Sequence, residues 1–280
     1  MTTGNVTRYV RYESGGRIAH GILEGDTVRE LEGELFENPR PTGKTVKLSD
    51  AKLLAPLDAR KVRKVLGIAG NFHVHGTPEP VIPHGRWFCK YPTSINSHEG
   101  EIECPPDAPN FNYEGELVLV IGKKGRDISL VDAPDYIWGV TVGNDYSENT
   151  WIRHEHMTEG VSPLLSKATD SWAALYHTIV RGMDYSDLGI EIRLNGEVNA
   201  KGRTPDMVHK PAQLVNYISH FMTLMPGDVI YTGTVAPQTL EGKRKQLHPG
   251  DVVEVEIEGI GVLRNKLVPM KGVTTESVHL

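Results

Sequence analysis

The stretch that decides the fold is residues 113–121, Tyr-Glu-Gly-Glu-Leu-Val-Leu-Val-Ile. Side chains alternate between the two faces of a strand, so Glu114 and Glu116 share one face with the valines, and the leucines occupy the other. A strand that is apolar on both faces is buried on both faces. The stretch therefore predicts a central strand whose first residues bring two carboxylates to the edge of a core.

A third carboxylate is expected beside these two. Asp145 ends the next apolar strand, residues 137–144, and consecutive strands often pair. Like charges at the edge of a core are unfavourable unless a cation compensates them or one is protonated. Three carboxylates without a thiolate favour Mg²⁺, Mn²⁺ or Ca²⁺. The residues alone leave a solvated strand end equally possible for Glu114 and Glu116, although Gly115 between them permits a close backbone approach.

The rest of the chain predicts an α+β, mostly β protein with two domains. Residues 1–60 are interpreted as a small β-rich domain, in which residues 33–46 are polar, contain proline and are expected to form a loop. Residues 61–280 form the larger domain. Its clearest helix starts at Pro211, continues through an apolar repeat to Met225, and is expected to stop at Pro226-Gly227.

Two turns of one design follow in the larger domain. Pro226-Gly227-Asp228 and Pro249-Gly250-Asp251 each precede an apolar strand, and Pro-Gly suits the centre of a type II turn. The strand after the second turn alternates valine or isoleucine with glutamate, which predicts one buried and one solvated face.

Composition limits the function classes. The chain has 280 residues and a formal net charge of −6, which argues against nucleic acid as a partner. The basic run at 243–245 is short and is interpreted as a solvated loop. No run reaches the ~20 apolar residues of a membrane helix, and the N-terminus lacks the features of a signal peptide. Two cysteines, with no zinc spacing, suit a reducing compartment, so a cytoplasmic location without membrane contact is expected.

The ordered motifs of the larger domain resemble the fumarylacetoacetate hydrolase superfamily. They are Gly70-Asn71-Phe72 with His75, Phe88-Cys89-Lys90, Tyr113-Glu114-Gly115-Glu116-Leu117, Gly143-Asn144-Asp145-Tyr146-Ser147, Ser166-Lys167 with Asp170, Asn195-Gly196-Glu197, Thr204-Pro205-Asp206-Met207, and residues 224–234 ending in Thr232-Gly233-Thr234. The resemblance implies a mixed β-roll catalytic domain behind a small N-terminal domain, and a homodimer. It also implies Mg²⁺ or Mn²⁺, with Ca²⁺ as a further option, on Glu114, Glu116 and Asp145.

The resemblance extends to residues around this centre. Lys167 matches the active-site lysine of the family, and Thr234 matches a threonine expected to bind the substrate carboxylate. His75 matches a lid histidine that activates water in the hydrolases. The family's partner glutamate falls at Pro78 here, so Glu79, one residue further, is the candidate.

Other matches carry less weight or depart from the family pattern. His73 is expected to be a bystander, and Lys90 matches a strand lysine without an assigned role. Asn149, Ala200 and Val235 replace an arginine, a glutamine and a proline that many members carry around the substrate, so a substrate other than the commonest one is expected.

Three functions remain open from the sequence. The leading hypothesis is a metal-dependent hydrolase that cleaves a C–C bond in a 2,4-dioxo acid, such as an acylpyruvate or a fumarylpyruvate-like acid, to pyruvate and a carboxylic acid. The alternative is an oxaloacetate-type decarboxylase or a 2-hydroxy-dienoate isomerase, which needs the same metal but no residue that activates water. The third is a metal-stabilised binding protein without catalysis.

Overall fold

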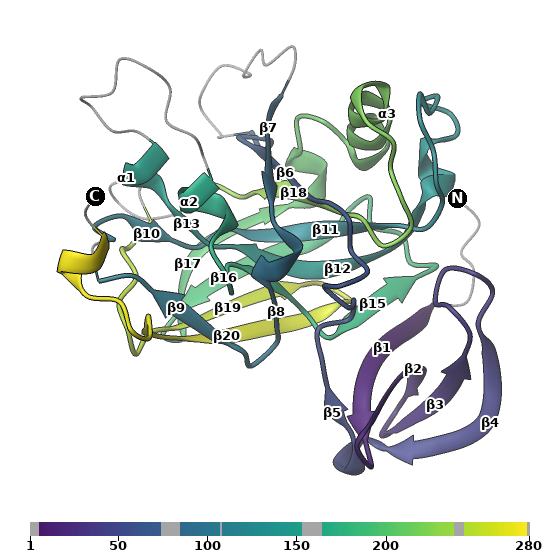
Figure 1. Cartoon of the computed structure of the whole chain (residues 1–280). Helices are drawn as coiled ribbons and strands as arrows, with labels where there is room; N and C mark the ends of the chain where they lie inside the picture. The colour runs from purple at the N-terminus through teal and green to yellow at the C-terminus, as the bar shows by residue number, and fades with distance from the viewer. Residues whose placement is uncertain (1–5, 74–84, 107, 153–163, 238–243, 279–280) are drawn as a thin grey trace.

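The structure is a computed structural model that describes residues 6–73, 85–106, 108–152, 164–237 and 244–278. Over these residues the chain consists mainly of strands, with three short α-helices at one side of the sheets (Figure 1). The predicted α+β, mostly β class is confirmed.

The larger sheet has thirteen strands within the described residues. Its path runs β4-β3-β2-β1-β15-β12-β11-β18-β6-β7, with β5, β8 and β14 joined at the sides. The strands are β1 (Thr7–Ser14), β2 (Arg17–Glu24), β3 (Thr27–Glu32), β4 (Arg40–Lys47), β5 (Lys52–Leu53), β6 (Val65–Ala69), β7 (Arg86–Lys90), β8 (Ile95–Ser97), β11 (Gly115–Ile121), β12 (Ile137–Asp145), β14 (Ala173–Leu175), β15 (Thr178–Arg181) and β18 (Val229–Thr234). The same sheet therefore includes both the N-terminal strands and the stretch around Glu116.

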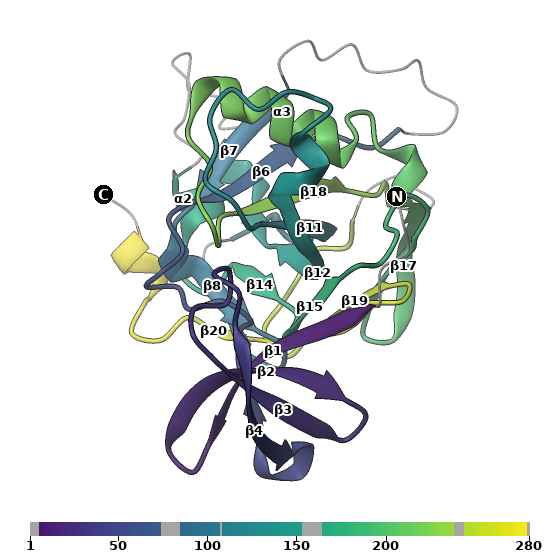
Figure 2. The same cartoon turned by 90° about the vertical axis from the view of Figure 1, so that its right-hand side faces the viewer.

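A second sheet of five strands, in the order β17-β16-β19-β20-β9, packs against the centre of the first. Its strands are β9 (Glu101–Cys104), β16 (Gly189–Leu194), β17 (Glu197–Arg203), β19 (Val252–Ile257) and β20 (Gly261–Pro269). A short pair, β10 (Phe111–Asn112) and β13 (Ser147–Glu148), lies beside the helices α1 (Asn149–Ile152) and α2 (Leu164–Ala168) (Figure 1). The helix α3 (Pro211–Phe221) lies near β6 and β18 (Figure 2). The 3₁₀ helices are η1 (Leu48–Asp50), η2 (Pro92–Ser94), η3 (Ala133–Tyr136), η4 (Thr204–Asp206) and η5 (Thr275–Val278).

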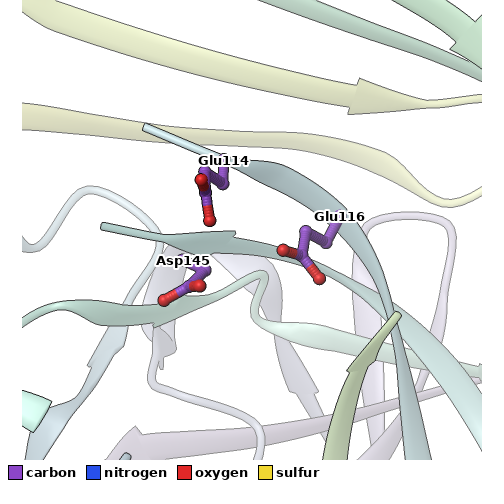
Figure 3. Close-up of side chains that lie close together, drawn as sticks. All are labelled: Glu114, Glu116 and Asp145. Atoms are coloured by element: carbon purple, nitrogen blue, oxygen red, sulfur yellow. The ribbon is translucent and has the colours of Figure 1, made fainter. Parts of the chain in front are cut away.

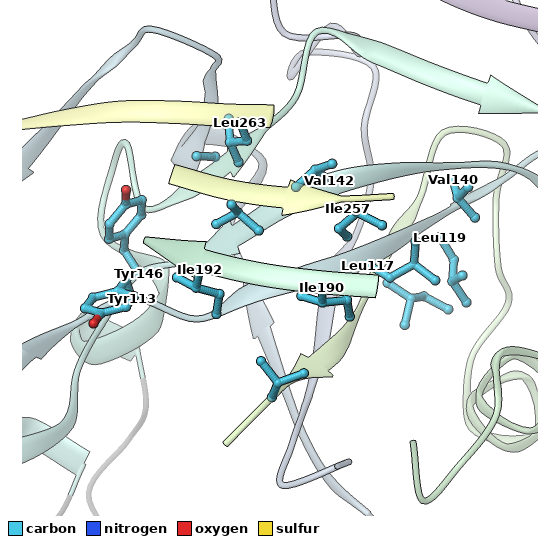
Figure 4. Close-up of a cluster of buried hydrophobic side chains, with 14 of the residues drawn as sticks. Tyr113, Leu117, Leu119, Val140, Val142, Tyr146, Ile190, Ile192, Ile257 and Leu263 are labelled. Carbon is cyan, nitrogen blue, oxygen red and sulfur yellow. The ribbon is translucent and has the colours of Figure 1, made fainter. Parts of the chain in front are cut away.

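The central strand β11 is buried on both faces, as predicted. Leu117, Leu119 and Ile121 belong to the main core between the two sheets, where they meet side chains of β16, β19 and β20 (Figure 4). Val118 and Val120 belong to a second core on the opposite face of the larger sheet. The alternating side chains of β11 thus contribute to two separate cores, one on each face of the larger sheet.

The N-terminal strands confirm a β-rich unit, with one correction. The segment 33–46 was expected to be a loop, but β4 occupies residues 40–47 and pairs with β3. β4 is the edge strand of the sheet and is mostly exposed, and an edge strand tolerates the missing N–H of Pro41. Polarity and proline are therefore compatible with a strand here. The domain boundary near residue 60 stays a prediction.

The helix at Pro211 is confirmed, but its predicted end is wrong. It stops at Phe221, which is exposed, and Met222 is already extended. Leu224 instead exchanges two backbone hydrogen bonds with Gly125, at 2.8 and 3.0 Å. The apolar repeat continues past the helix because this extended segment is also packed against the core, where Leu224 is fully buried.

The two Pro-Gly-Asp turns have the predicted form. Gly227 and Gly250 have φ of +85° and +100°, the left-handed region that the third residue of a type II turn requires. In each turn the aspartate carboxylate also accepts a hydrogen bond from the first residue's N–H, at 2.8 Å. In the strand after the second turn, Val253, Val255 and Ile257 are buried, which confirms its alternation.

Candidate metal centre

The three predicted carboxylates converge at one end of β11 and β12. Glu114 directly precedes β11, Glu116 lies in β11, and Asp145 is the last residue of β12. The two strands are antiparallel neighbours, and the Asp145 N–H donates to the Glu114 carbonyl at 2.8 Å. One carboxylate oxygen from each residue lies within 4.8 Å of the other two (Figure 3).

Gly115 makes this arrangement possible. A Cβ added at this position would lie 2.6 Å from Val255 Cγ1 and 2.9 Å from two carbons of Ile192. The backbone between the two glutamates therefore packs directly on the five-stranded sheet, which only glycine permits. The close approach expected from the sequence is present.

The centre is buried and strongly acidic. Glu116 and Asp145 are 1% and 0% exposed, and Glu114 is partly exposed. Burial raises the pKa of Glu116 well above its usual range, and the charges of Asp145 and Glu114 raise it further. A divalent cation would compensate this charge, and three carboxylate oxygens fit the hard cations Mg²⁺, Mn²⁺ and Ca²⁺. The residues thus fit the metal that the sequence predicts.

Lys167 lies at the centre, as the sequence predicted. Its ammonium group, on α2, donates to Glu114 Oε2 at 2.8 Å, Asp145 Oδ2 at 2.5 Å and Ser147 Oγ at 3.0 Å. It also lies 4.5 Å from the centre of the Phe88 ring, a cation–π contact. Burial alone would lower the pKa of Lys167, but the attraction of Asp145 and Glu114 outweighs burial and raises it. Lys167 is therefore a fixed positive charge.

Lys90 is a second buried cation, to which the sequence assigned no role. Its ammonium group donates to Asp145 Oδ1 and, at 2.9 Å, to the carbonyl of Tyr146. Burial lowers the pKa of Lys90 to about 8, although Asp145 acts in the opposite direction. Each oxygen of Asp145 is thus held by one lysine. Strand alternation could have indicated this position of Lys90, because Lys90 shares a strand face with Phe88, and Phe88 contacts Lys167.

Glu116 is held by the turn at the end of β18. The Gly233 N–H donates to Glu116 Oε2 at 2.6 Å. Gly233 has φ of +96°, and a Cβ there would lie 2.8 Å from the Cβ of Asn71. Asn71 is itself buried and donates to the carbonyl of Thr232 at 2.8 Å. The Asn71 and Thr232-Gly233-Thr234 motifs therefore act together to position this carboxylate.

Thr234 lies directly across the ladder from Glu116 in the β11–β18 pairing. Its hydroxyl oxygen accepts a hydrogen bond from Arg244 Nη2 at 3.0 Å. The threonine is thus at the centre, where a substrate-binding role stays a prediction. Sequence reasoning missed Arg244.

Most of the predicted lid residues are not among those that the structure describes. His75, Pro78 and Glu79 fall outside the described residues, so their catalytic roles stay predictions. His73 is described and donates its backbone N–H to the carbonyl of Asp206 at 2.9 Å.

Comparison with known proteins identifies the family. The model named fumarylacetoacetate (FAA) hydrolase C-terminal matches residues 64–268, and a model named Rv2993c-like, N-terminal matches residues 7–56. The chain belongs to the fumarylacetoacetate hydrolase family. Members of this family are enzymes that act on small molecules, and they commonly use divalent metals.

Three relatives illustrate the reactions found in the family. The human mitochondrial oxaloacetate tautomerase FAHD2A is 36% identical over 79% of this chain and 70% of its own length. The structure of a 5-carboxymethyl-2-hydroxymuconate delta-isomerase from Mycobacterium smegmatis is 34% identical with a TM-score of 0.82, covering 94% of this chain and 99% of that one. A fumarylacetoacetate hydrolase from Exiguobacterium antarcticum is 29% identical with a TM-score of 0.80, at 94% and 99% coverage.

Among the helices in the described ranges, none has both the length and the apolar character needed to cross a bilayer. The expected homodimer and cytoplasmic location stay predictions.

Proposed function

We propose that this protein uses a divalent cation, Mg²⁺ or Mn²⁺, on Glu114, Glu116 and Asp145 to interconvert enol and keto forms of a small 2-oxo acid. The charge balance of the site carries the proposal. Three carboxylates and the ammonium groups of Lys90 and Lys167 leave one net negative charge. A divalent cation reverses that sign, which suits an anionic substrate whose negative charge moves onto oxygen during the reaction.

The residues of the chain have distinct tasks in this proposal. When bound, the cation supplies Lewis-acid stabilisation of charge on the 2-oxo and carboxylate oxygens. Lys90 and Lys167 fix the two oxygens of Asp145, and Lys167 also faces Glu114. The Thr234 hydroxyl accepts from Arg244, so its own proton is available to the substrate carboxylate. His75 is the proposed proton carrier, because imidazole titrates near neutral pH.

Two considerations favour proton relocation over C–C cleavage. An enol–keto interconversion needs an enolate-stabilising site and one proton carrier, whereas hydrolysis also needs a positioned water and its base. Over the aligned residues, the tautomerase and the isomerase named above are 36% and 34% identical to this chain, and the hydrolase is 29% identical. Hydrolysis of an acylpyruvate, with His75 and Glu79 directing water, remains the second candidate because it uses the same metal centre.

The test measures both reactions on one preparation. Protein with Mg²⁺ or Mn²⁺ is mixed with enol-oxaloacetate, and loss of enol absorbance is compared with the rate produced by the metal alone. Acetylpyruvate is assayed in parallel for loss of diketone absorbance and release of pyruvate. Accelerated enol loss with intact acetylpyruvate supports the proposal. Release of pyruvate from acetylpyruvate would identify the hydrolase instead.

The remaining outcomes separate the other candidates. Carbon dioxide release from oxaloacetate beyond the metal-only rate would indicate a decarboxylase. Metal-dependent thermal stabilisation without turnover of either acid would indicate a binding protein and would refute the enzymatic proposals. The variant His75→Ala distinguishes the roles of the lid, because hydrolysis should collapse without the histidine whereas metal-driven decarboxylation should largely survive.

A further inference from the structure

Arg244 stands apart from the basic run in which it occurs. This run was interpreted as a solvated loop, and Lys245 fits that interpretation, since its side chain is 55% exposed and pairs with the exposed Glu197. Arg244 is partly buried instead, and its side chain turns toward the end of β18. The interpretation is therefore wrong for Arg244, whose contacts connect it to the metal centre.

The guanidinium of Arg244 is anchored beside the centre. Nη2 donates to Thr234 Oγ1 at 3.0 Å and to the carbonyl of Val235 at 2.7 Å. Thr234 is the ladder partner of Glu116, one of the three clustered carboxylates. Two hydrogen bonds from one nitrogen fix the orientation of the planar group, so its remaining donors point in set directions.

One of those remaining donors is buried and unused. Arg244 Nε has no hydrogen-bond partner among the described residues. Buried polar groups without a partner are rare, and an unpaired donor on a permanently charged guanidinium is especially unfavourable. The buried hydroxyl of Tyr113, the residue before Glu114, also lacks a partner in this part of the chain and lies within electrostatic reach of Arg244. An unused buried donor therefore lies beside Thr234.

A carboxylate matches this arrangement. It accepts hydrogen bonds only and pairs with the edge of a guanidinium, and such charge-assisted bonds are among the strongest in proteins. In the proposed reaction Thr234 would bind the first carboxylate of the substrate, beside the residues that would hold the metal. Because Arg244 contacts Thr234, a second carboxylate at the other end of a short substrate would come within reach of its guanidinium.

We infer that Arg244 binds a second carboxylate of the substrate and makes the site selective for dicarboxylic 2-oxo acids. This inference rests on the proposed function. It adds the class of substrate and the residue that recognises it.

The test compares oxaloacetate with its 4-methyl ester, which keeps the carbon skeleton but lacks the distal charge. The wild type should have the higher kcat/KM for oxaloacetate. Arg244→Gln should lower this preference by roughly 10- to 100-fold, the loss expected for a hydrogen-bonded charge pair. Arg244→Lys keeps the charge but not the planar fork and should restore part of the preference. Lys245→Gln, the exposed neighbour, is the matched control and should leave it unchanged.

A binding measurement keeps the inference separate from turnover. Calorimetry with Mg²⁺ and 3,3-difluoro-oxaloacetate, which cannot enolise, against its 4-methyl ester should show the same loss of discrimination in Arg244→Gln. If neither substrate reacts but the difluoro acid binds with an Arg244-dependent preference, the proposed function fails and the binding role stands. Equal losses for acid and ester, or no preference in the wild type, would overturn the inference.

Discussion

Replacing Gly115 by alanine tests whether the backbone between the two glutamates is held against the second sheet. The added Cβ would lie 2.6 Å from Val255 Cγ1, while carbon atoms pack at about 3.5–4.0 Å, so about 1 Å of movement is required. Both obstructing side chains, Val255 and Ile192, are fully buried. Overpacking of this kind destabilises by roughly 1–3 kcal/mol, and the loss of glycine's chain entropy offsets about 0.5–1 kcal/mol. We expect a net loss of about 1 kcal/mol.

The assay is thermal and urea unfolding with and without Mn²⁺. The loss corresponds to a Tm lower by roughly 2–4 °C in a domain of this size. Because Glu114 and Glu116 flank the substitution, Gly115→Ala should also gain less stability from Mn²⁺ than the wild type does. A tenfold weaker Mn²⁺ affinity would lower this metal-induced stabilisation by about 1.4 kcal/mol.

The matched control is Gly189→Ala on β16. Its nearest neighbour would be the end of the flexible Glu258 side chain, 3.3 Å away. This variant makes the same entropic gain without obstruction, so its stability should be unchanged or slightly higher. Equal stabilities of Gly115→Ala and Gly189→Ala would refute the packing argument.

Four further predictions concern buried titratable groups. Glu116→Gln should be at least as stable as the metal-free wild type, because it removes a buried like charge. Mn²⁺ should not raise the Tm of this variant, and a Tm increase equal to that of the wild type would show that Glu116 is not a ligand. Asp145→Asn leaves Lys90 and Lys167 without their shared counter-charge and should lose about 3–5 kcal/mol in urea denaturation, so a loss below about 1 kcal/mol would contradict the ion-pair account. Lys90→Met should raise KM for the anionic substrate roughly tenfold without weakening Mn²⁺ binding measured by calorimetry, and a weaker Mn²⁺ affinity would contradict the charge balance. Burial, and then His98, lower the pKa of His177 to about 4. Between about pH 6.5 and 4 the unfolded chain therefore binds a proton that the folded chain does not, so the stability of the protein falls as the pH falls. His177→Gln should remove about 2 kcal/mol of this loss, measured by urea unfolding at pH 7 and 4.5, and an unchanged dependence of stability on pH would exclude His177 as its source.

The carboxylate cluster was predictable because it depends on local rules. Alternation along β11 determines the face of Glu116, and pairing of two consecutive strands brings Asp145 beside Glu114. The errors arose where a local signal has two structural meanings. Polar residues with a proline form an edge strand at β4, and an apolar repeat after Phe221 continues as a buried extended segment. Neither distinction is visible without the neighbouring elements.

The roles of Lys90 and Arg244 depend on contacts that the local sequence pattern does not indicate. Lys90 and Asp145 are 55 residues apart, and they meet because β7 reaches the site through β6 and β18 rather than by pairing with β12. Arg244 contacts Thr234, ten residues earlier in the chain, and no periodicity in the sequence indicates this contact. An inward-facing lysine on a strand was a usable signal for the first, but the basic composition of 243–245 pointed to solvent for the second.

Contacts within the protein determine the geometry of the three carboxylates. A cluster of carboxylates alone would depend on a metal for its geometry, yet here protein groups hold all three predicted ligands, including Glu114, whose Oε2 accepts a hydrogen bond from Lys167. Both oxygens of Asp145 are held by lysines, and Glu116 is held by the Gly233 N–H. The positions of the three proposed ligands are therefore preorganised by the fold. Selection among substrates is then expected from the side chains that reach past the centre, which in the described residues are Thr234 and Arg244.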